Sequence, residues 1–307
     1  MKVVVVGAGG FVGQRLATLL AEQEDISELV LIDQIPRAAP ETPNSRLRVV
    51  QGDFGDPALI EAHIAGSATV YLLASILGGA AEANYALARK VNIDASLTLI
   101  EALRDCNPST RLVFASTIAV YAKPMPELVT DDTPTGPTMV YGAQKLMMEA
   151  AVSNFAARGW LDGVSLRLSG VMARDGADAR LKSAFMSRVF YAVMRGEDIV
   201  LPVHPQSRTW LTSVETAARN FAHAGRLDAR SLGRDRAFTL PTFHLTFEEL
   251  VDALRHRFPE SRSKVTYAPD EELVALFGSY PPIETGIADR LGFSRDRDAG
   301  ELVQLSL

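Results

Sequence analysis

Tyr141 and Lys145 are the residues of this 307-residue chain whose types and spacing most clearly allow chemistry. They lie four positions apart in the segment Tyr-Gly-Ala-Gln-Lys, and this spacing puts both side chains on one face of a helix. The phenol of tyrosine has an ordinary pKa of about 10, which makes it a poor base at neutral pH. A neighbouring ammonium favours the phenolate, so we expect the pair to remove and return a proton.

A hydroxyl that could hold the reacting oxygen of a substrate precedes this pair. Thr117 lies 24 residues before Tyr141 and follows the apolar segment 111–116, which has the pattern of a buried strand. Ser116 stands beside it and could share the role. The sequence therefore predicts proton transfer at a substrate hydroxyl.

The first loop of the chain has the pattern of a dinucleotide-binding turn. Gly7, Gly10 and Gly13 form a GxxGxxG motif between the β-branched run 3–6 and the helical pattern 11–20. Glycine permits the tight turn and lets backbone N–H groups approach a pyrophosphate at the positive end of the helix. This context favours dinucleotide binding over a plain glycine-rich turn.

Two acidic residues refine the expected cofactor. Asp33 ends the second predicted strand, 20 residues after Gly13, where its carboxylate would bind the adenosine ribose and repel a 2′-phosphate. NAD is therefore expected rather than NADP, although Arg37 follows closely. Asp53 could fix the adenine amino group or cap a helix that begins at Pro57, and both interpretations stay open.

Strands and helices alternate through the first ~170 residues, which predicts an α/β fold with a doubly wound parallel Rossmann sheet and ligand at the carboxyl ends of its strands. After Gly170 the regularity weakens, and we expect a smaller, interleaved C-terminal α+β substrate lobe. The predicted domains are 1–170 with 208–226 returning to it, and a lobe of 171–207 and 227–307. The expected strands are 3–6, 29–32, 47–50, 69–74, 111–116 and 164–168, and the expected helices are 11–20, 57–64, 83–103, 141–158, 180–195, 247–257 and 270–277.

Composition argues against several classes of partner. The net charge of −6 offers no positive field for nucleic acid or anionic lipid, and no apolar segment reaches the ~18 residues needed to span a bilayer. The single cysteine, Cys106, and the absence of a signal-peptide pattern lead us to expect a cytoplasmic protein. The five histidines show no HxxxH or HxxE spacing, so no metal site is expected.

These motifs, together with the run 114–121 and Leu166-Arg-Leu168, resemble the extended short-chain dehydrogenases/reductases, the NAD-dependent epimerase/dehydratase superfamily. The resemblance implies an NAD-dependent enzyme acting on CH–OH groups, with Thr117 as the catalytic hydroxyl, Tyr141 as acid and base, and Lys145 on the nicotinamide ribose. Ala122 departs from the glycine that commonly follows Val-Tyr there. The helices 83–103 and 141–158 resemble the pair that forms a homodimer interface in the superfamily. Further cofactor contacts are expected from Phe11, Val12, Phe54, Ala74, Ser75, Asn92 and Leu168.

A narrower resemblance points to a substrate. The segments 78–85, 130–132, 166–174 and 208–213 resemble the D-erythronate dehydrogenases, which oxidise the C2 hydroxyl of a four-carbon sugar acid. In the implied reaction the Tyr141 phenolate takes the hydroxyl proton while the C2 hydride passes to nicotinamide.

A small-molecule sugar acid needs a cationic anchor for its carboxylate, and arginine suits that geometry. Arg174 and Arg208 are the candidates; Arg208 could instead hold a diphosphate, and either arginine could form a surface ion pair. Ser75, Ser116 and Ser169 could contact substrate hydroxyls.

Three other functions are weighed against this one. A dehydratase is disfavoured because Ile118 and Ala119 stand where such enzymes carry an acidic pair. A nucleotide-sugar 4-epimerase is the enzymatic alternative, although Gly170 replaces an asparagine common in those proteins. A non-catalytic dinucleotide sensor on the same fold typically lacks the tyrosine and lysine pair, which is intact here.

Overall fold

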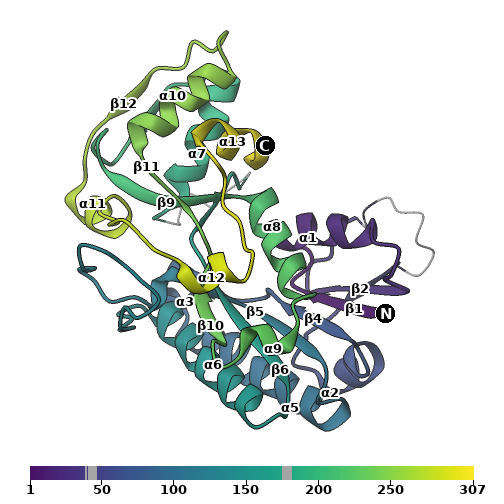
Figure 1. Ribbon diagram of the computed structural model, residues 1–307. Helices are drawn as coiled ribbons and strands as arrows, with labels where there is room; N and C mark the ends of the chain where they lie inside the picture. The colour runs from purple at the N-terminus through teal and green to yellow at the C-terminus, as the bar shows by residue number, and fades with distance from the viewer. Residues whose placement is uncertain (39, 41–46, 175–181) are drawn as a thin grey trace. The chain divides into compact units, whose positions relative to one another are not determined.

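A computed structural model describes residues 1–38, 40, 47–174 and 182–307 of the chain (Figure 1). The chain divides into two compact units. Unit 1 contains Met1–Tyr121, Thr135–Leu168 and Ala218–Thr239, and unit 2 contains Ala122–Pro134, Ser169–Ala217 and Leu240–Leu307.

Unit 1 is built on a seven-stranded sheet in which every neighbouring pair of strands is parallel. The strand order is β10-β6-β5-β4-β1-β2-β3. Strands β2 and β3 are thus added on one side of β1, and the chain then returns to add β4 and the later strands on the other side. This arrangement confirms the predicted doubly wound Rossmann sheet. The strands are β1 (Lys2–Val6), β2 (Glu28–Asp33), β3 (Leu47–Gln51), β4 (Thr69–Leu72), β5 (Arg111–Thr117), β6 (Asp162–Leu168) and β10 (Ala237–Thr239).

The apolar run of β1 is buried on both faces of the sheet, as its lack of polar alternation predicted. Val4 and Val6 belong to a core that also includes Leu99 of α5 and Met148 of α6. The side chains between them point to the opposite face, which α1 covers (Figure 1). Buried strands of this kind hold their carboxyl ends in fixed positions for a site.

The helices of unit 1 depart from the expected pattern at two places. The segment 83–103 was expected to be one helix, but the chain breaks at Asn84, whose side chain accepts a hydrogen bond from the Leu87 N–H and caps a new helix. Two stretches expected to be α-helical, Ile60–Ile64 and Lys90–Ala95, are π-helical. The helical segments are α1 (Phe11–Ala21), α2 (Pro57–Leu59), η1 (Ile60–Ile64), α3 (Gly78–Ala83), α4 (Tyr85–Arg89), η2 (Lys90–Ala95), α5 (Ser96–Cys106), η3 (Ile118–Val120), α6 (Val140–Ala157) and α9 (Ala229–Leu232), and α8 (Val214–Ala224) continues from unit 2 into unit 1.

Unit 2 has two small sheets and a core of its own. One sheet has the order β11-β9-β7 and the other pairs β12 with β8, so strand 208–213 lies in a unit 2 sheet. The predicted helix 247–257 is confirmed, and its capping box joins Thr246 and Glu249. The strands and helices of unit 2 are β7 (Gly170–Met172), β8 (Ile199–Leu201), β9 (Arg208–Ser213), β11 (Phe243–Thr246), β12 (Val265–Tyr267), α7 (Ala184–Arg195), α10 (Phe247–Arg257), α11 (Glu271–Phe277), α12 (Gly286–Arg290) and α13 (Ala299–Ser306).

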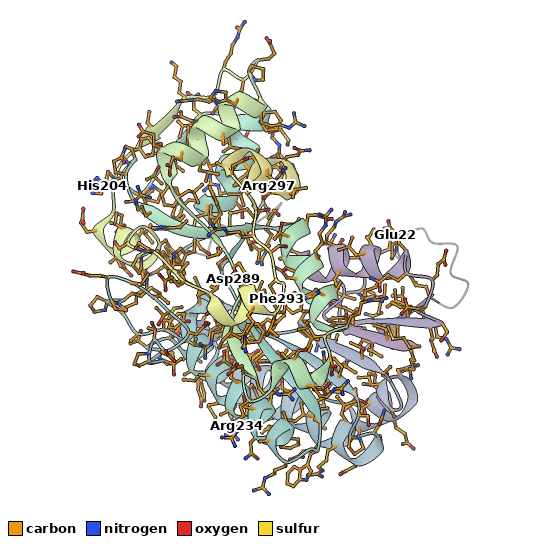
Figure 2. The ribbon with its side chains drawn as sticks, in the orientation of Figure 1. Glu22, His204, Arg234, Asp289, Phe293 and Arg297 are labelled. Carbon is orange, nitrogen blue, oxygen red and sulfur yellow. The ribbon has the colours of Figure 1, made fainter. Side chains whose placement is uncertain are left out.

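The last helix of unit 2 shows how local sequence fixes an element. Asp298 caps α13 by accepting a hydrogen bond from the Glu301 N–H. Arg297, which is labelled in Figure 2, then pairs with the Glu301 carboxylate at 3.0 Å.

Among the residues that the structure describes, no helix is long and apolar enough to cross a membrane. Within the same residues, no three His, Cys, Asp or Glu side chains lie close enough together to hold a metal ion.

Candidate active site

The glycine-rich turn is closed so tightly that side chains would not fit. Gly7 has φ +90°, and a Cβ there would stand 2.5 Å from the Ala74 backbone nitrogen. A Cβ on Gly13 would stand 2.1 Å from the Gly7 carbonyl oxygen. Gly10 is the N-cap of α1, which begins with Phe11 and Val12. The turn therefore presents bare backbone at a helix N-terminus, the arrangement that a pyrophosphate requires.

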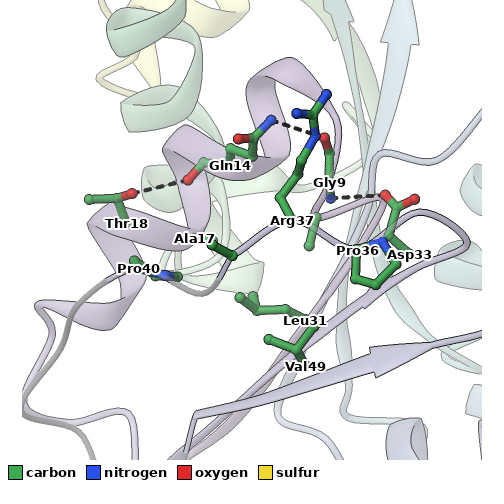
Figure 3. A pocket seen from close by; sticks show the side chains of 12 residues that line it. Gly9, Gln14, Ala17, Thr18, Leu31, Asp33, Pro36, Arg37, Pro40 and Val49 are labelled. Atoms are coloured by element: carbon green, nitrogen blue, oxygen red, sulfur yellow. Dashed lines mark hydrogen bonds between the residues drawn. The ribbon is translucent and has the colours of Figure 1, made fainter.

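Asp33 connects the end of β2 to this turn. Its carboxylate accepts hydrogen bonds from the Gly9 N–H at 2.9 Å and from the Ile35 N–H at 3.0 Å. A pocket opens beside it, and Figure 3 shows Asp33 and Arg37 among the residues that line it. Gly9 lies inside the motif but was not predicted as a site residue. A Cβ there would stand 2.5 Å from the Ile35 carbonyl oxygen, so this position also excludes a side chain. The turn and this pocket together fit the adenosine side of NAD.

Asp53 and Phe54 follow β3. The Asp53 carboxylate accepts a hydrogen bond from the Gly55 N–H at 2.9 Å, and Phe54 is buried in the core of unit 1. The interpretation of Asp53 as a helix cap is wrong, because Asp56 caps α2 by accepting a hydrogen bond from the Ala58 N–H. Asp53 closes a turn of its own instead.

Asn92 lies in the π-helical segment η2 and holds the loop that follows β4. Its side chain accepts a hydrogen bond from the Ile76 N–H at 2.8 Å and donates one to the Ile76 carbonyl at 3.0 Å. It also donates to the Gln144 side-chain oxygen at 2.8 Å. Ala74 and Ser75 directly precede Ile76, so Asn92 fixes the backbone of the expected cofactor loop.

Gln144 is a member of this network that the sequence analysis missed, although it lies between Tyr141 and Lys145. Its carboxamide is buried, and the side-chain nitrogen has no hydrogen-bond partner among the described residues. Through Gln144, helix α6 and the loop after β4 are tied to the same asparagine. The missed signal was a polar side chain on the buried side of a helix.

Tyr141 and Lys145 lie in the first two turns of α6. The Lys145 ammonium donates to the Ala115 carbonyl at 2.7 Å and lies 4.5 Å from the centre of the Phe114 ring. It is 5.8 Å from the centre of the Tyr141 ring. Burial lowers the pKa of Lys145 to about 7, and the negative charge of Glu149 opposes this shift. The Lys145 ammonium is thus fully charged only below neutral pH.

Ser116 and Thr117 are successive residues of β5, so their side chains leave opposite faces of the sheet. The Thr117 hydroxyl oxygen accepts a hydrogen bond from the Ala119 N–H at 3.1 Å, which leaves its own hydrogen available. The Ser116 hydroxyl donates to the Glu149 carboxylate at 2.5 Å. Glu149 also pairs with Arg167 at 2.8 Å, so Ser116 belongs to a buried ionic network.

The carboxyl ends of the strands bring most of the expected residues of unit 1 to one edge. Gly7 follows β1, Asp33 ends β2, and Ala74 and Ser75 follow β4. Thr117 ends β5 and is in register with Leu168 at the end of β6. Ligands of open parallel sheets bind at this edge.

The remaining expected substrate residues lie in unit 2. The Ser169 hydroxyl is hydrogen-bonded to the Thr242 hydroxyl at 2.7 Å. The Arg174 backbone N–H donates a hydrogen bond to the Ser187 hydroxyl oxygen at 3.1 Å. Arg174 directly precedes residues 175–181, which lie outside the described residues. Arg208 is exposed at the start of β9, and no ion pair within 4 Å joins it to the described part of the chain. Its positive charge contributes to the lowered pKa of Glu249, so that carboxylate lies near it.

The chain is similar to known proteins over most or nearly all of its length. The family model of the NAD dependent epimerase/dehydratase family matches residues 3–228. Two relatives named D-erythronate dehydrogenase are 32% identical to it: that of Haemophilus influenzae, over 99% of this chain and 98% of its own length, and that of Cupriavidus necator, over 99% and 97%. A solved structure described as the nucleoside-diphosphate-sugar epimerase from Agrobacterium tumefaciens superposes with a TM-score of 0.90 at 28% identity, over 99% of this chain and 92% of that one. The chain belongs to the NAD dependent epimerase/dehydratase family, which confirms the predicted NAD-dependent enzyme class.

Proposed function

We propose that this protein oxidises the C2 hydroxyl of a short sugar acid, with D-erythronate as the reference substrate, to the 2-oxo acid. The observation that carries the proposal is the similarity over nearly the whole chain to two enzymes named for that substrate. Full-length similarity extends through unit 2, where the residues expected to select the substrate lie.

In this proposal Tyr141 takes the proton of the substrate hydroxyl and Thr117 holds the oxygen. The Thr117 hydroxyl oxygen accepts a hydrogen bond from the Ala119 N–H, and its own hydrogen can be donated to the substrate. Lys145 binds the nicotinamide ribose and, when charged, stabilises the phenolate. NAD, when bound, would supply the acceptor for the C2 hydride. The Asn92 and Gln144 bridge keeps the loop at Ser75 and the helix of Tyr141 in fixed positions.

A second candidate, a nucleotide-sugar 4-epimerase, has support of its own. The UDP-glucose 4-epimerase of Corynebacterium glutamicum is 28% identical over 78% of this chain and 75% of its own length. Such an enzyme uses NAD without net reduction, so the two functions differ in whether reduced cofactor accumulates.

A screen of four- to six-carbon aldonic acids with NAD tests the proposal by the absorbance of reduced cofactor. We expect accumulation with D-erythronate, and a slower rate together with transfer of label to the cofactor when C2 carries deuterium. Absence of turnover with every acid would overturn the proposal. Conversion of UDP-galactose to UDP-glucose with no accumulation would establish the epimerase in its place.

A further inference from the structure

Lys123 in unit 2 has a buried charge that the protein does not neutralise. Its ammonium nitrogen is out of contact with water and has no hydrogen-bond partner among the described residues. Burial alone lowers the pKa of this lysine to about 8, because no charged neighbour contributes. An ammonium has three N–H donors, and leaving them unmatched away from water is costly.

The ammonium lies on an aromatic side chain. Its nitrogen is 3.9 Å from the centre of the Tyr280 ring, which is a close cation–π contact. Such a contact contributes less than the hydrogen bonds that water would supply. Tyr280 cannot serve as a counter-anion, since burial raises the pKa of its phenol to about 12. The Tyr280 ring thus stabilises the Lys123 ammonium, but no anionic oxygen of the described residues neutralises its charge.

Tyr280 is held firmly in this position by β9 and β11. Its ring packs against Trp210 with ring centres 4.8 Å apart. Its backbone N–H donates to the Arg208 carbonyl at 3.0 Å, and its own carbonyl is bonded to the His244 ring at 2.9 Å. The aromatic support under Lys123 is therefore rigid.

Arg208 adds a second cation on the same face of this sheet. Arg208 and Trp210 are two residues apart on β9, so their side chains leave the sheet on one side. His244 lies opposite Trp210 in the antiparallel pair and shares that side. Burial lowers the pKa of His244, so this ring is neutral at pH 7. The Glu249 carboxylate on the adjoining turn accepts hydrogen bonds from the Thr246 N–H and hydroxyl, and the charge of Arg208 also lowers its pKa. Arg208 thus has an acid near it, whereas Lys123 has none in the described part of the chain.

We infer that Lys123, seated on the Tyr280 ring, binds the carboxylate of the substrate. The inference rests on the proposed function, because the sugar acid supplies the carboxylate. The ammonium of lysine is a compact charge with three donors, which suits a carboxylate oxygen. Lys123 belongs to no sequence motif, because the residues that surround its side chain lie more than 80 positions away in the chain.

Calorimetry on the enzyme loaded with reduced NAD tests the inference without turnover. The probes are D-erythronate, the neutral tetrol erythritol, and UDP as a diphosphate. We expect Lys123→Met to weaken D-erythronate binding at least tenfold and to leave erythritol and NAD affinity within twofold. Lys264→Met removes an exposed lysine of the same unit and should bind D-erythronate as the wild type does.

The outcomes separate the inference from the proposed function. If wild type binds D-erythronate through Lys123 but never reduces NAD with it, the carboxylate site stands and the proposed function fails. If wild type oxidises the acid and Lys123→Met has unchanged affinity and KM, the inferred site is wrong. If the substitution weakens UDP alone, the site holds a diphosphate and the inference is overturned.

Discussion

At the scale of single residues, Lys145 combines an expected role at the nicotinamide ribose with an energetic cost. Its ammonium is buried against Phe114 and the Ala115 carbonyl, and Tyr141 and Glu149 are the titratable groups on its own helix. The folded protein holds the proton of this lysine more weakly than the unfolded chain does. The structure thus predicts a stability penalty that depends on pH.

Substitution of Lys145 by methionine should therefore stabilise the cofactor-free protein more at pH 7 than at pH 9. The folded-state pKa is about 7 and the unfolded value is 10.5, so between these values the unfolded chain binds more protons. Wild-type stability then rises with pH, on the order of 1 kcal/mol for each pH unit. Urea unfolding at several pH values measures the difference between the variants. A stability difference between wild type and variant that stays constant with pH would contradict the burial of this charge. Lys264→Met, which removes an exposed lysine, is the control.

At the scale of elements, the turn between β1 and α1 depends on the absence of a side chain at Gly13. Gly13→Ala would press a methyl group onto the Gly7 carbonyl, so we expect a loss of about 1–3 kcal/mol in stability and at least tenfold in NAD affinity. Chemical denaturation and NAD titration measure both. Gly79→Ala, where a Cβ meets nothing within 4 Å, is the control. Equal NAD affinity in the two variants would refute the assigned cradle.

The Asn92 and Gln144 bridge couples the loop after β4 to helix α6. A double-mutant cycle with alanine at both positions should give a coupling energy on the order of 1 kcal/mol in unfolding. The pair Asn92 and Gln23 shares no partner and should be additive. If the losses in unfolding free energy at Asn92 and Gln144 were additive, the hydrogen bond between them would contribute nothing to stability.

The sequence predicted the elements with strong periodicity and missed those set by tertiary contacts. The strands of β1, β2 and β5 were predicted within one or two residues because their apolar runs are buried on both faces. Strand β10 has three residues and takes its place by pairing with β6, which no local pattern reveals. The π-helical turns at 60–64 and 90–95 likewise have no signature in spacing.

The same distinction applies to the candidate site. The glycine turn, Asp33, Thr117, Tyr141 and Lys145 follow from motifs with a local mechanism, and the structure places their backbones at one sheet edge or on α6. Their roles stay predictions. Gln144 and Lys123 could not be found in this way, because each is defined by partners distant in the sequence.

At the scale of the whole molecule, the expected homodimer remains a prediction. Light scattering should give about twice the chain mass of 33.2 kDa. Met147 is 58% exposed on α6, one of the helices expected at the interface, so Met147→Glu should yield monomers. Met194→Glu, at a 40% exposed position on α7, should remain dimeric. A monomeric wild type would refute the expectation.

The central claim is that Tyr141 transfers the proton while NAD receives the hydride, and the turnover of Tyr141→Phe tests it most directly. With D-erythronate and NAD, kcat should fall by ~10²–10⁴-fold while NAD affinity stays within twofold, because only the phenol oxygen is removed. Tyr267→Phe, in unit 2, should keep wild-type kcat. Wild-type turnover by Tyr141→Phe would contradict the account.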